Sequence, residues 1–246
     1  MKMSPSKTLL EVEGVSVHYG GVRALEPTTF SVAEHSQTLI LGPNGAGKTS
    51  LLRALAGAVP ARTGRVVLTG VNITSLAAFK RVKRGIALVP EGRGRLPTLT
   101  VSDNLTLGWE SAPASRREPY ERELSRIFDL FPVLHERMDQ DCSSLSGGEM
   151  QMLAIARGLL AKPLVLLLDE PSLGLAPLAI ARVYDALARL SASGLAMVIV
   201  EQKAVPLPSE RETTIVLYNG RIRFHEPRRP TMDELAMLYL GERTAS

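Results

Sequence analysis

A run of eight residues with regularly placed glycines is the clearest chemical signal in this chain. It follows the spacing G-x-x-x-x-G-K-[ST], in which glycines let backbone N–H groups turn inward around phosphate oxygens. A helix that begins at the end of such a loop adds partial positive charge, the lysine reaches the β- and γ-phosphates, and the hydroxyl binds Mg²⁺. The pattern predicts a nucleotide phosphate site, and the alternative is a glycine-rich turn with a chance lysine. The predicted site comprises Gly42, Pro43, Asn44, Gly45, Ala46, Gly47, Lys48, Thr49 and Ser50.

Two acids follow an apolar run later in the chain. Asp169 and Glu170 end the segment LVLLLDE, whose residues 164–168 are typical of a buried strand. Ligands of parallel sheets bind at the carboxyl ends of the strands. We therefore expect Asp169 to hold Mg²⁺ through water and Glu170 to orient, or accept a proton from, a water that attacks the phosphate. Without the phosphate loop, an acid pair in the first turn of a helix would be an equal alternative.

A second turn with glycines lies about 20 residues before that strand. The segment LSGGE directly precedes the helical pattern MQMLAIARGLL, and its last four residues are Ser146, Gly147, Gly148 and Glu149. A serine and two glycines at a helix start leave backbone N–H groups available to an anion. The alternative is a plain serine N-cap followed by a glycine turn.

Short apolar segments and helical patterns must position these residues. Strands are predicted at 8–18, 38–41, 65–68, 85–89, 164–168, 195–200, 214–218 and 221–224, and helices at 50–58, 120–130, 178–191 and 231–240. This alternation implies a largely parallel sheet. Apolar positions between about 100 and 162 follow helical spacing instead, which predicts an all-helical insertion. Within it, residues 108–119 are predicted to be a polar loop. Thr63-Gly64, earlier in the chain, is predicted to be a turn.

The composition excludes several classes of protein. Of the 246 residues 45% are hydrophobic and 22% are charged, which is too apolar for a disordered chain. The net charge of +4 comes without a basic stripe, so no nucleic-acid partner is expected. No apolar run approaches the roughly 18 residues that a membrane helix needs, and the N-terminus does not resemble a signal peptide. The single cysteine, Cys142, allows no internal disulfide and suits a reducing cytosol.

Taken in order, these motifs resemble those of the ATP-binding cassette (ABC) proteins, because LSGGE is similar to the LSGGQ signature of that family. The resemblance covers residues 8 to 241. It implies an α/β fold: a P-loop NTPase core, in which helices flank a mostly parallel sheet with an N-terminal antiparallel β part, plus an inserted all-helical subdomain. It also implies ATP and Mg²⁺ as cofactors, with Tyr19 stacking on the adenine. The alternative is that Tyr19 is an ordinary core or surface tyrosine.

The family architecture also implies a dimer. Two cassettes pack head to tail, and each ATP lies between the phosphate loop of one subunit and the signature of the other. Ser146 and Gly148, with their neighbours Gly147 and Glu149, would then bind the partner's nucleotide. The segment 172–177 corresponds to the one that crosses between the two subunits.

Two departures from the family pattern resemble one branch, the second ATPase of branched-chain amino acid importers. Glu91 stands where most members have glutamine, and Gln202 stands where most have the switch histidine. Five segments of this chain resemble those of that branch: VPEGR, LSGGE, DEPSLGLAP, VEQ and YLG. Gln202 can hydrogen-bond a γ-phosphate but carries no charge, and Glu91 is a candidate ligand of Mg²⁺ or water. The family usually has a helix after this position, and Pro206 and Pro208 interrupt it. A weakened ATPase activity is therefore an alternative.

The expected organisation is a single ABC ATPase domain over residues 8–241. It would comprise a nucleotide-binding core, 8–95 and 160–241, and a helical signature subdomain, 96–159, with flexible termini at 1–7 and 242–246.

The resemblance implies an ATP-hydrolysing, energy-coupling subunit of a bacterial importer, for branched-chain amino acids or related small solutes. The expected partners are a second ABC ATPase subunit, in a homo- or heterodimer, integral membrane permease subunits and, indirectly, a solute-binding protein. Such a subunit works at the cytoplasmic face of the inner membrane. The permease loops would dock on the helical insertion, with Glu91 at its hinge. The alternatives are a catalytically weak or silent ATP-binding partner in a heterodimer and a soluble ABC ATPase outside transport.

Overall fold

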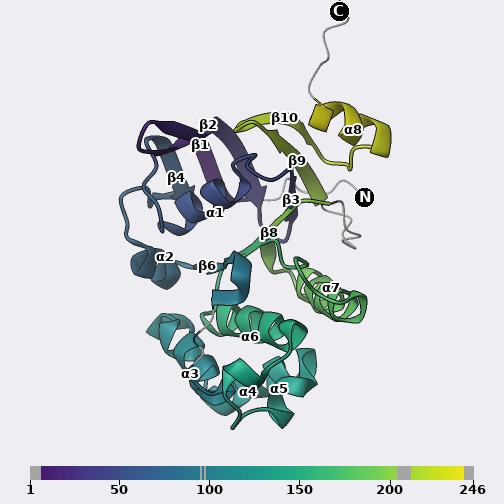
Figure 1. Cartoon of the computed structure of the whole chain (residues 1–246). Coiled ribbons are helices and arrows are strands. Elements are labelled where there is room, and N and C mark those ends of the chain that lie inside the picture. Colours follow the sequence, from purple (N-terminus) through teal and green to yellow (C-terminus); the bar gives the residue numbers. More distant parts are fainter. Residues whose placement is uncertain (1–6, 95, 97, 204–211, 241–246) are drawn as a thin grey trace, which may run out of the picture.

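The computed structural model describes residues 7–94, 96, 98–203 and 212–240 (Figure 1). The prolines at 206 and 208 and both predicted flexible ends, except Lys7, lie outside these residues. The strands are β1 Thr8–Tyr19, β2 Val22–Ala33, β3 Gln37–Leu41, β4 Thr63–Leu68, β5 Val71–Asn72, β6 Ile86–Val89, β7 Val165–Asp169, β8 Ala196–Glu201, β9 Glu212–Tyr218 and β10 Arg221–Glu226. The α-helices are α1 Lys48–Ala56, α2 Ala78–Arg84, α3 Val101–Ser111, α4 Tyr120–Leu130, α5 Pro132–Glu136, α6 Gly147–Leu160, α7 Pro177–Ala192 and α8 Met232–Leu240.

The strands form two sheets. The six-stranded sheet has the order β10-β9-β3-β8-β7-β6, and its pairs are parallel apart from the β9–β10 hairpin. The four-stranded sheet has the order β2-β1-β4-β5 and is antiparallel. This arrangement confirms the predicted fold class, a mostly parallel sheet with an N-terminal antiparallel part. In the parallel sheet the carboxyl ends of β3 and β7 lie at one edge, where the phosphate loop and the two acids follow.

The apolar core lies in two layers. One layer fills the space between the two sheets around α1, whose residues Leu51, Leu52 and Leu55 are fully buried. The other layer lies between the parallel sheet and the helices α6 and α7, and it includes Leu153, Ile155 and other residues of α6. The inner strands β3, β7 and β8 are therefore covered on both faces, which explains their continuous apolar runs.

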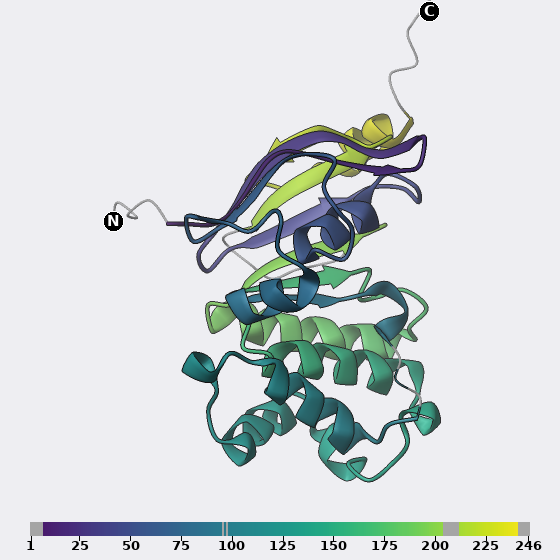
Figure 2. The ribbon, with the colours of Figure 1, turned by 90° about the vertical axis from the view of Figure 1, so that its left-hand side faces the viewer.

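The helices α3 to α6 lie together on one side of the parallel sheet, as Figure 2 shows. The predicted loop at 108–119 was partly wrong, because α3 runs on to Ser111. Gly108 is buried inside this helix, where a Cβ atom would lie 2.6 Å from the carbonyl oxygen of Arg157 on α6. The glycine lets two helices approach closely, so it does not end the helix.

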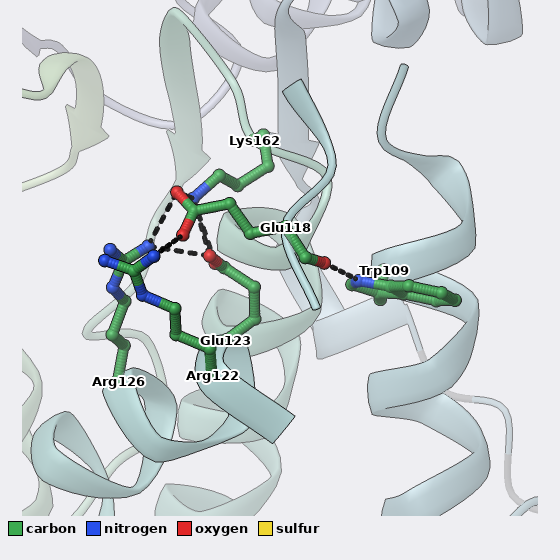
Figure 3. Close-up of polar contacts among 6 residues, drawn as sticks. All are labelled: Trp109, Glu118, Arg122, Glu123, Arg126 and Lys162. Carbon is green, nitrogen blue, oxygen red and sulfur yellow. Dashed lines mark hydrogen bonds and ion pairs between the residues drawn. The ribbon is translucent and has the colours of Figure 1, made fainter. Parts of the chain in front are cut away.

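Charged side chains tie this helical part to the strand that carries Asp169. Lys162, in the connection between α6 and β7, donates to both carboxylate oxygens of Glu123 on α4, at 2.9 and 3.0 Å. Arg126 pairs with the same carboxylate at 2.7 Å and with Glu118 at 3.2 Å. The Trp109 indole donates to the Glu118 carbonyl oxygen at 2.8 Å (Figure 3). The cluster links α3, α4 and the start of β7 through polar contacts.

Two further strand assignments from the sequence differ from the structure. Thr63-Gly64 begins the strand β4 instead of forming a turn. The strand β2 was not predicted, although its second half alternates between buried and exposed residues. After β10, Arg228 pairs with Glu234 on α8 at 2.8 Å, and Arg229 pairs with Glu212 on β9 at 2.6 Å. Within the described ranges, no helix is both long and apolar enough to cross a membrane.

Candidate nucleotide site

The phosphate loop connects the central strand β3 to α1. Gly47 precedes the helix with φ +99°, a left-handed conformation, and a Cβ atom here would lie 2.5 Å from the carbonyl oxygen of Ala24. Only glycine fits both conditions without strain. The helix therefore begins at Lys48 with its first N–H groups at the loop, which is the arrangement that binds phosphate.

The Lys48 side chain is buried in the loop. Its ammonium group donates to the carbonyl oxygens of Gly42 at 2.7 Å and Pro43 at 3.0 Å. It also forms an ion pair with Glu170 at 3.2 Å, in which the two side chains are 4% and 8% exposed. The structure therefore joins the phosphate loop directly to the acid that follows β7.

The Thr49 hydroxyl donates to Asp169 at 3.1 Å. Burial, together with the charges of Glu91 and Glu170, raises the pKa of Asp169 to about 6, against the opposing effect of this hydrogen bond. A divalent cation beside Asp169 would favour its ionised form. A hydroxyl and a carboxylate are oxygen ligands of the kind that Mg²⁺ accepts, usually from one or two protein groups together with phosphates. The described residues contain no cluster of three or more acids, histidines or cysteines that could hold a metal alone. The pair therefore fits Mg²⁺ bound together with a nucleotide.

A cleft of about 390 Å³ opens over the phosphate loop. The loop residues from Asn44 to Ser50 line it together with Glu91 and Glu170. Ala24 and Leu173 also line the cleft and were not predicted. Leu173 is 47% exposed beside the two acids, and its position two residues after the DEP segment was the available signal.

Glu170 has an unusual backbone. Its φ is +48°, which residues with a side chain seldom adopt. Its N–H donates to the carbonyl oxygen of Val200 at 3.0 Å, so the end of β8 holds this turn. Backbone strain of this kind persists where surrounding contacts enforce it, and it is common at catalytic positions.

Ser146 and its neighbours form the start of α6. The Ser146 hydroxyl accepts from the Glu149 N–H at 3.3 Å, and the Glu149 carboxylate accepts from the Ser146 N–H at 2.8 Å. This reciprocal cap explains why serine and glutamate stand three residues apart. Gly148 is buried against α7, where a Cβ atom would lie 2.6 Å from that of Ala179. Gly147 and its three neighbours do not line the cleft, so their proposed contact with a nucleotide needs a second subunit.

The two remaining candidates lie at the ends of strands. Tyr19 ends β1, is 43% exposed, and does not line the cleft over the phosphate loop. Gln202 directly follows β8, and its carbonyl oxygen accepts from the Tyr239 hydroxyl at 3.2 Å. Cys142 is buried, and its sulfur accepts from the Asn104 amide at 3.0 Å.

Comparisons with known proteins agree with this geometry. A sequence model of the ABC transporter family matches residues 25–173. The chain is 38% identical over 218 residues to the high-affinity branched-chain amino acid transport ATP-binding protein BraG of Pseudomonas aeruginosa, covering 89% of this chain and 92% of that protein. It is 32% identical to the probable branched-chain amino acid transport ATP-binding protein LivF of Archaeoglobus fulgidus, covering 88% of this chain and 91% of that protein. The solved ADP conformation of an ATP-binding cassette of an ABC transporter superposes with a TM-score of 0.76, at 25% identity and 94% coverage of both chains.

The fold and the phosphate site define an ATP-binding cassette. The chain belongs to the ABC transporter family. It is an ATP-binding and ATP-hydrolysing subunit that couples hydrolysis to transport.

Proposed function

We propose that this chain energises the import of branched-chain amino acids or closely related small solutes. The support for this solute class is the 38% identity to BraG over most of both chains, together with the LivF relative. The segments VPEGR, LSGGE and VEQ, which carry Glu91, Glu149 and Gln202, add the resemblance to one importer branch.

In the proposed reaction, a water molecule attacks the γ-phosphate of ATP in line with the leaving ADP. Glu170 orients this water and accepts its proton, and Gln202 hydrogen-bonds the γ-phosphate. Lys48 and the N–H groups of the phosphate loop bind the phosphates, and Thr49 and Asp169, with Glu91 nearby, hold Mg²⁺. When bound, Mg²⁺ would neutralise part of the negative charge of the phosphates. The convergence of Lys48, Thr49, Asp169 and Glu170 is the observation that supports this proposal most directly.

The working unit is proposed to be a dimer of two such subunits, identical or different, bound to membrane permeases at the cytoplasmic face. Tyr19 would stack on adenine, and Ser146 to Glu149 would contact the nucleotide of the partner subunit. In this proposal residues 8–95 and 160–241 form the nucleotide-binding core, and 96–159 form the helical subdomain that contacts the permeases.

Two experiments test the proposal. Mg²⁺-dependent ATP hydrolysis by the purified chain is expected to disappear in Glu170→Gln, whereas ATP binding is expected to remain. ATP binding without hydrolysis, also in the presence of a partner ATPase and permeases, would favour the catalytically silent subunit instead. For the solute, uptake of labelled leucine by cells lacking this chain should be restored by the wild type and not by Lys48→Ala. Uptake that does not depend on the chain would contradict the solute class while leaving the ATPase intact.

A further inference from the structure

The last residue of β8 is a buried acid for which the reaction above has no use. Glu201 is 3% exposed and does not line the cleft over the phosphate loop. It directly precedes Gln202, the residue proposed to contact the γ-phosphate. Burying a carboxylate costs free energy unless its oxygens accept hydrogen bonds. The donors that contact Glu201 therefore show which segments it connects.

Glu201 accepts hydrogen bonds from two other segments of the chain. One carboxylate oxygen accepts from the Ser172 N–H at 3.0 Å and from the Tyr184 hydroxyl at 2.5 Å. The other oxygen accepts from the Ser172 hydroxyl at 2.9 Å. Burial raises the pKa of Glu201 above its ordinary value, and these three hydrogen bonds offset only part of the shift. Three donors face the two carboxylate oxygens, so both oxygens are held.

These contacts attach the Glu170 turn to the end of β8 at two neighbouring points. The Glu170 N–H donates to Val200, and two residues later both the N–H and the hydroxyl of Ser172 donate to Glu201. Glu170, in this turn, has a left-handed backbone that is strained for a residue with a side chain. Such a conformation persists only where surrounding contacts enforce it, and these hydrogen bonds are such contacts. Tyr184, which is 6% exposed on α7, fixes the carboxylate from the other side.

We propose that Glu201 is a positioning residue for ATP hydrolysis. It touches no substrate and acts through Ser172, holding the Glu170 turn and Gln202 in a fixed relation to each other and to α7. The inference rests on the proposed roles of Glu170 and Gln202. It gives a role to the glutamate of the VEQ segment, for which the resemblance implies none, and this role links the carboxyl ends of the strands β7 and β8.

Hydrogen exchange of the nucleotide-free chain tests the attachment without requiring activity. In Glu201→Leu, no oxygen remains to accept from the Ser172 N–H, so this N–H should exchange at least about tenfold faster. Faster exchange is also expected in the peptide that contains Gln202. The matched control is Glu123→Leu, which removes another buried carboxylate with three donor contacts, on α4 (Figure 3). Unchanged exchange at Ser172, or an equal increase in the control, would overturn the inference.

Steady-state ATP hydrolysis then tests the effect on the reaction. Glu201→Leu is expected to lower kcat by about tenfold or more, with ATP affinity and KM within about twofold of the wild type, because the phosphate loop is untouched. Tyr184→Phe should lower kcat less and should add little to Glu201→Leu, because the two residues act as one unit. A variant with wild-type kcat, or one that loses ATP affinity and kcat equally, would refute the positioning role. A wild type that binds ATP without hydrolysing it would contradict the proposed function, while the exchange result would still decide whether Glu201 holds the turn.

Discussion

The buried ion pair between Lys48 and Glu170 should make the nucleotide-free protein sensitive to the charge of Glu170. Two unit charges 3.2 Å apart attract by about 5 kcal/mol at an effective dielectric constant of about 20. Removing one partner of a buried pair typically costs about 3–5 kcal/mol, because the other charge is left uncompensated. Lys48 keeps its hydrogen bonds to Gly42 and Pro43. We therefore expect Glu170→Gln to lower the free energy of unfolding by about 3 kcal/mol.

ATP should reverse this loss, because its phosphates give Lys48 a new negative partner. For a chain of this size, about 3 kcal/mol corresponds to a fall in Tm of roughly 6–12 °C. Saturating ATP should therefore raise the Tm of Glu170→Gln by more than it raises that of the wild type, by an amount close to the initial loss. Thermal unfolding without Mg²⁺, with and without ATP, measures both quantities while avoiding hydrolysis.

The control variant is Glu123→Gln, which removes the charge of a buried carboxylate remote from the phosphate loop. It should lose stability in the same experiment without any additional gain from ATP. The reasoning is refuted if nucleotide-free Glu170→Gln unfolds at the wild-type temperature. It is also refuted if ATP raises the Tm of both proteins equally.

Three further predictions concern the parts that surround the cleft. Gly148→Ala should cost about 1–3 kcal/mol in urea unfolding, because its Cβ atom would meet Ala179 at 2.6 Å; an unchanged midpoint would contradict the close approach of α6 and α7. Arg81→Met should cost about 2–4 kcal/mol, because the buried guanidinium donates to the carbonyl oxygens of Ala54 and Leu55 at the end of α1, and an unchanged Tm would show that these carbonyls need no donor. Because the pKa of Asp169 is raised to about 6, the folded state holds its proton more firmly than the unfolded state. Stability without Mg²⁺ should therefore fall as the pH rises from about 4 to about 6, and Asp169→Asn should remove up to about 3 kcal/mol of this fall. Equal pH slopes in the two proteins would contradict that assignment.

Much of the fold could be predicted because the relevant signals are local. The helix α4 was predicted at its observed bounds, since its apolar residues repeat at helical spacing. The strands of the parallel sheet were found within a residue or two, because strands buried on both faces read as apolar runs. The extent of α3 was missed because Gly108 is a weak helix former whose absent side chain is needed only for packing on α6. The strand β2 was missed although it alternates, because a proline and threonines interrupt its apolar pattern.

The sequence by itself determined the phosphate loop and the helix cap at Ser146 and Glu149. Both depend on the spacing of neighbouring residues, so a short stretch of chain carries all the information that they need. The tertiary structure alone decided that Lys48 pairs with Glu170 and that Glu201 holds Ser172 and Tyr184. These partners come from different strands and helices, and the order of strands in the sheet brings them together. Their meeting depends on long-range packing, which no local pattern of residues contains.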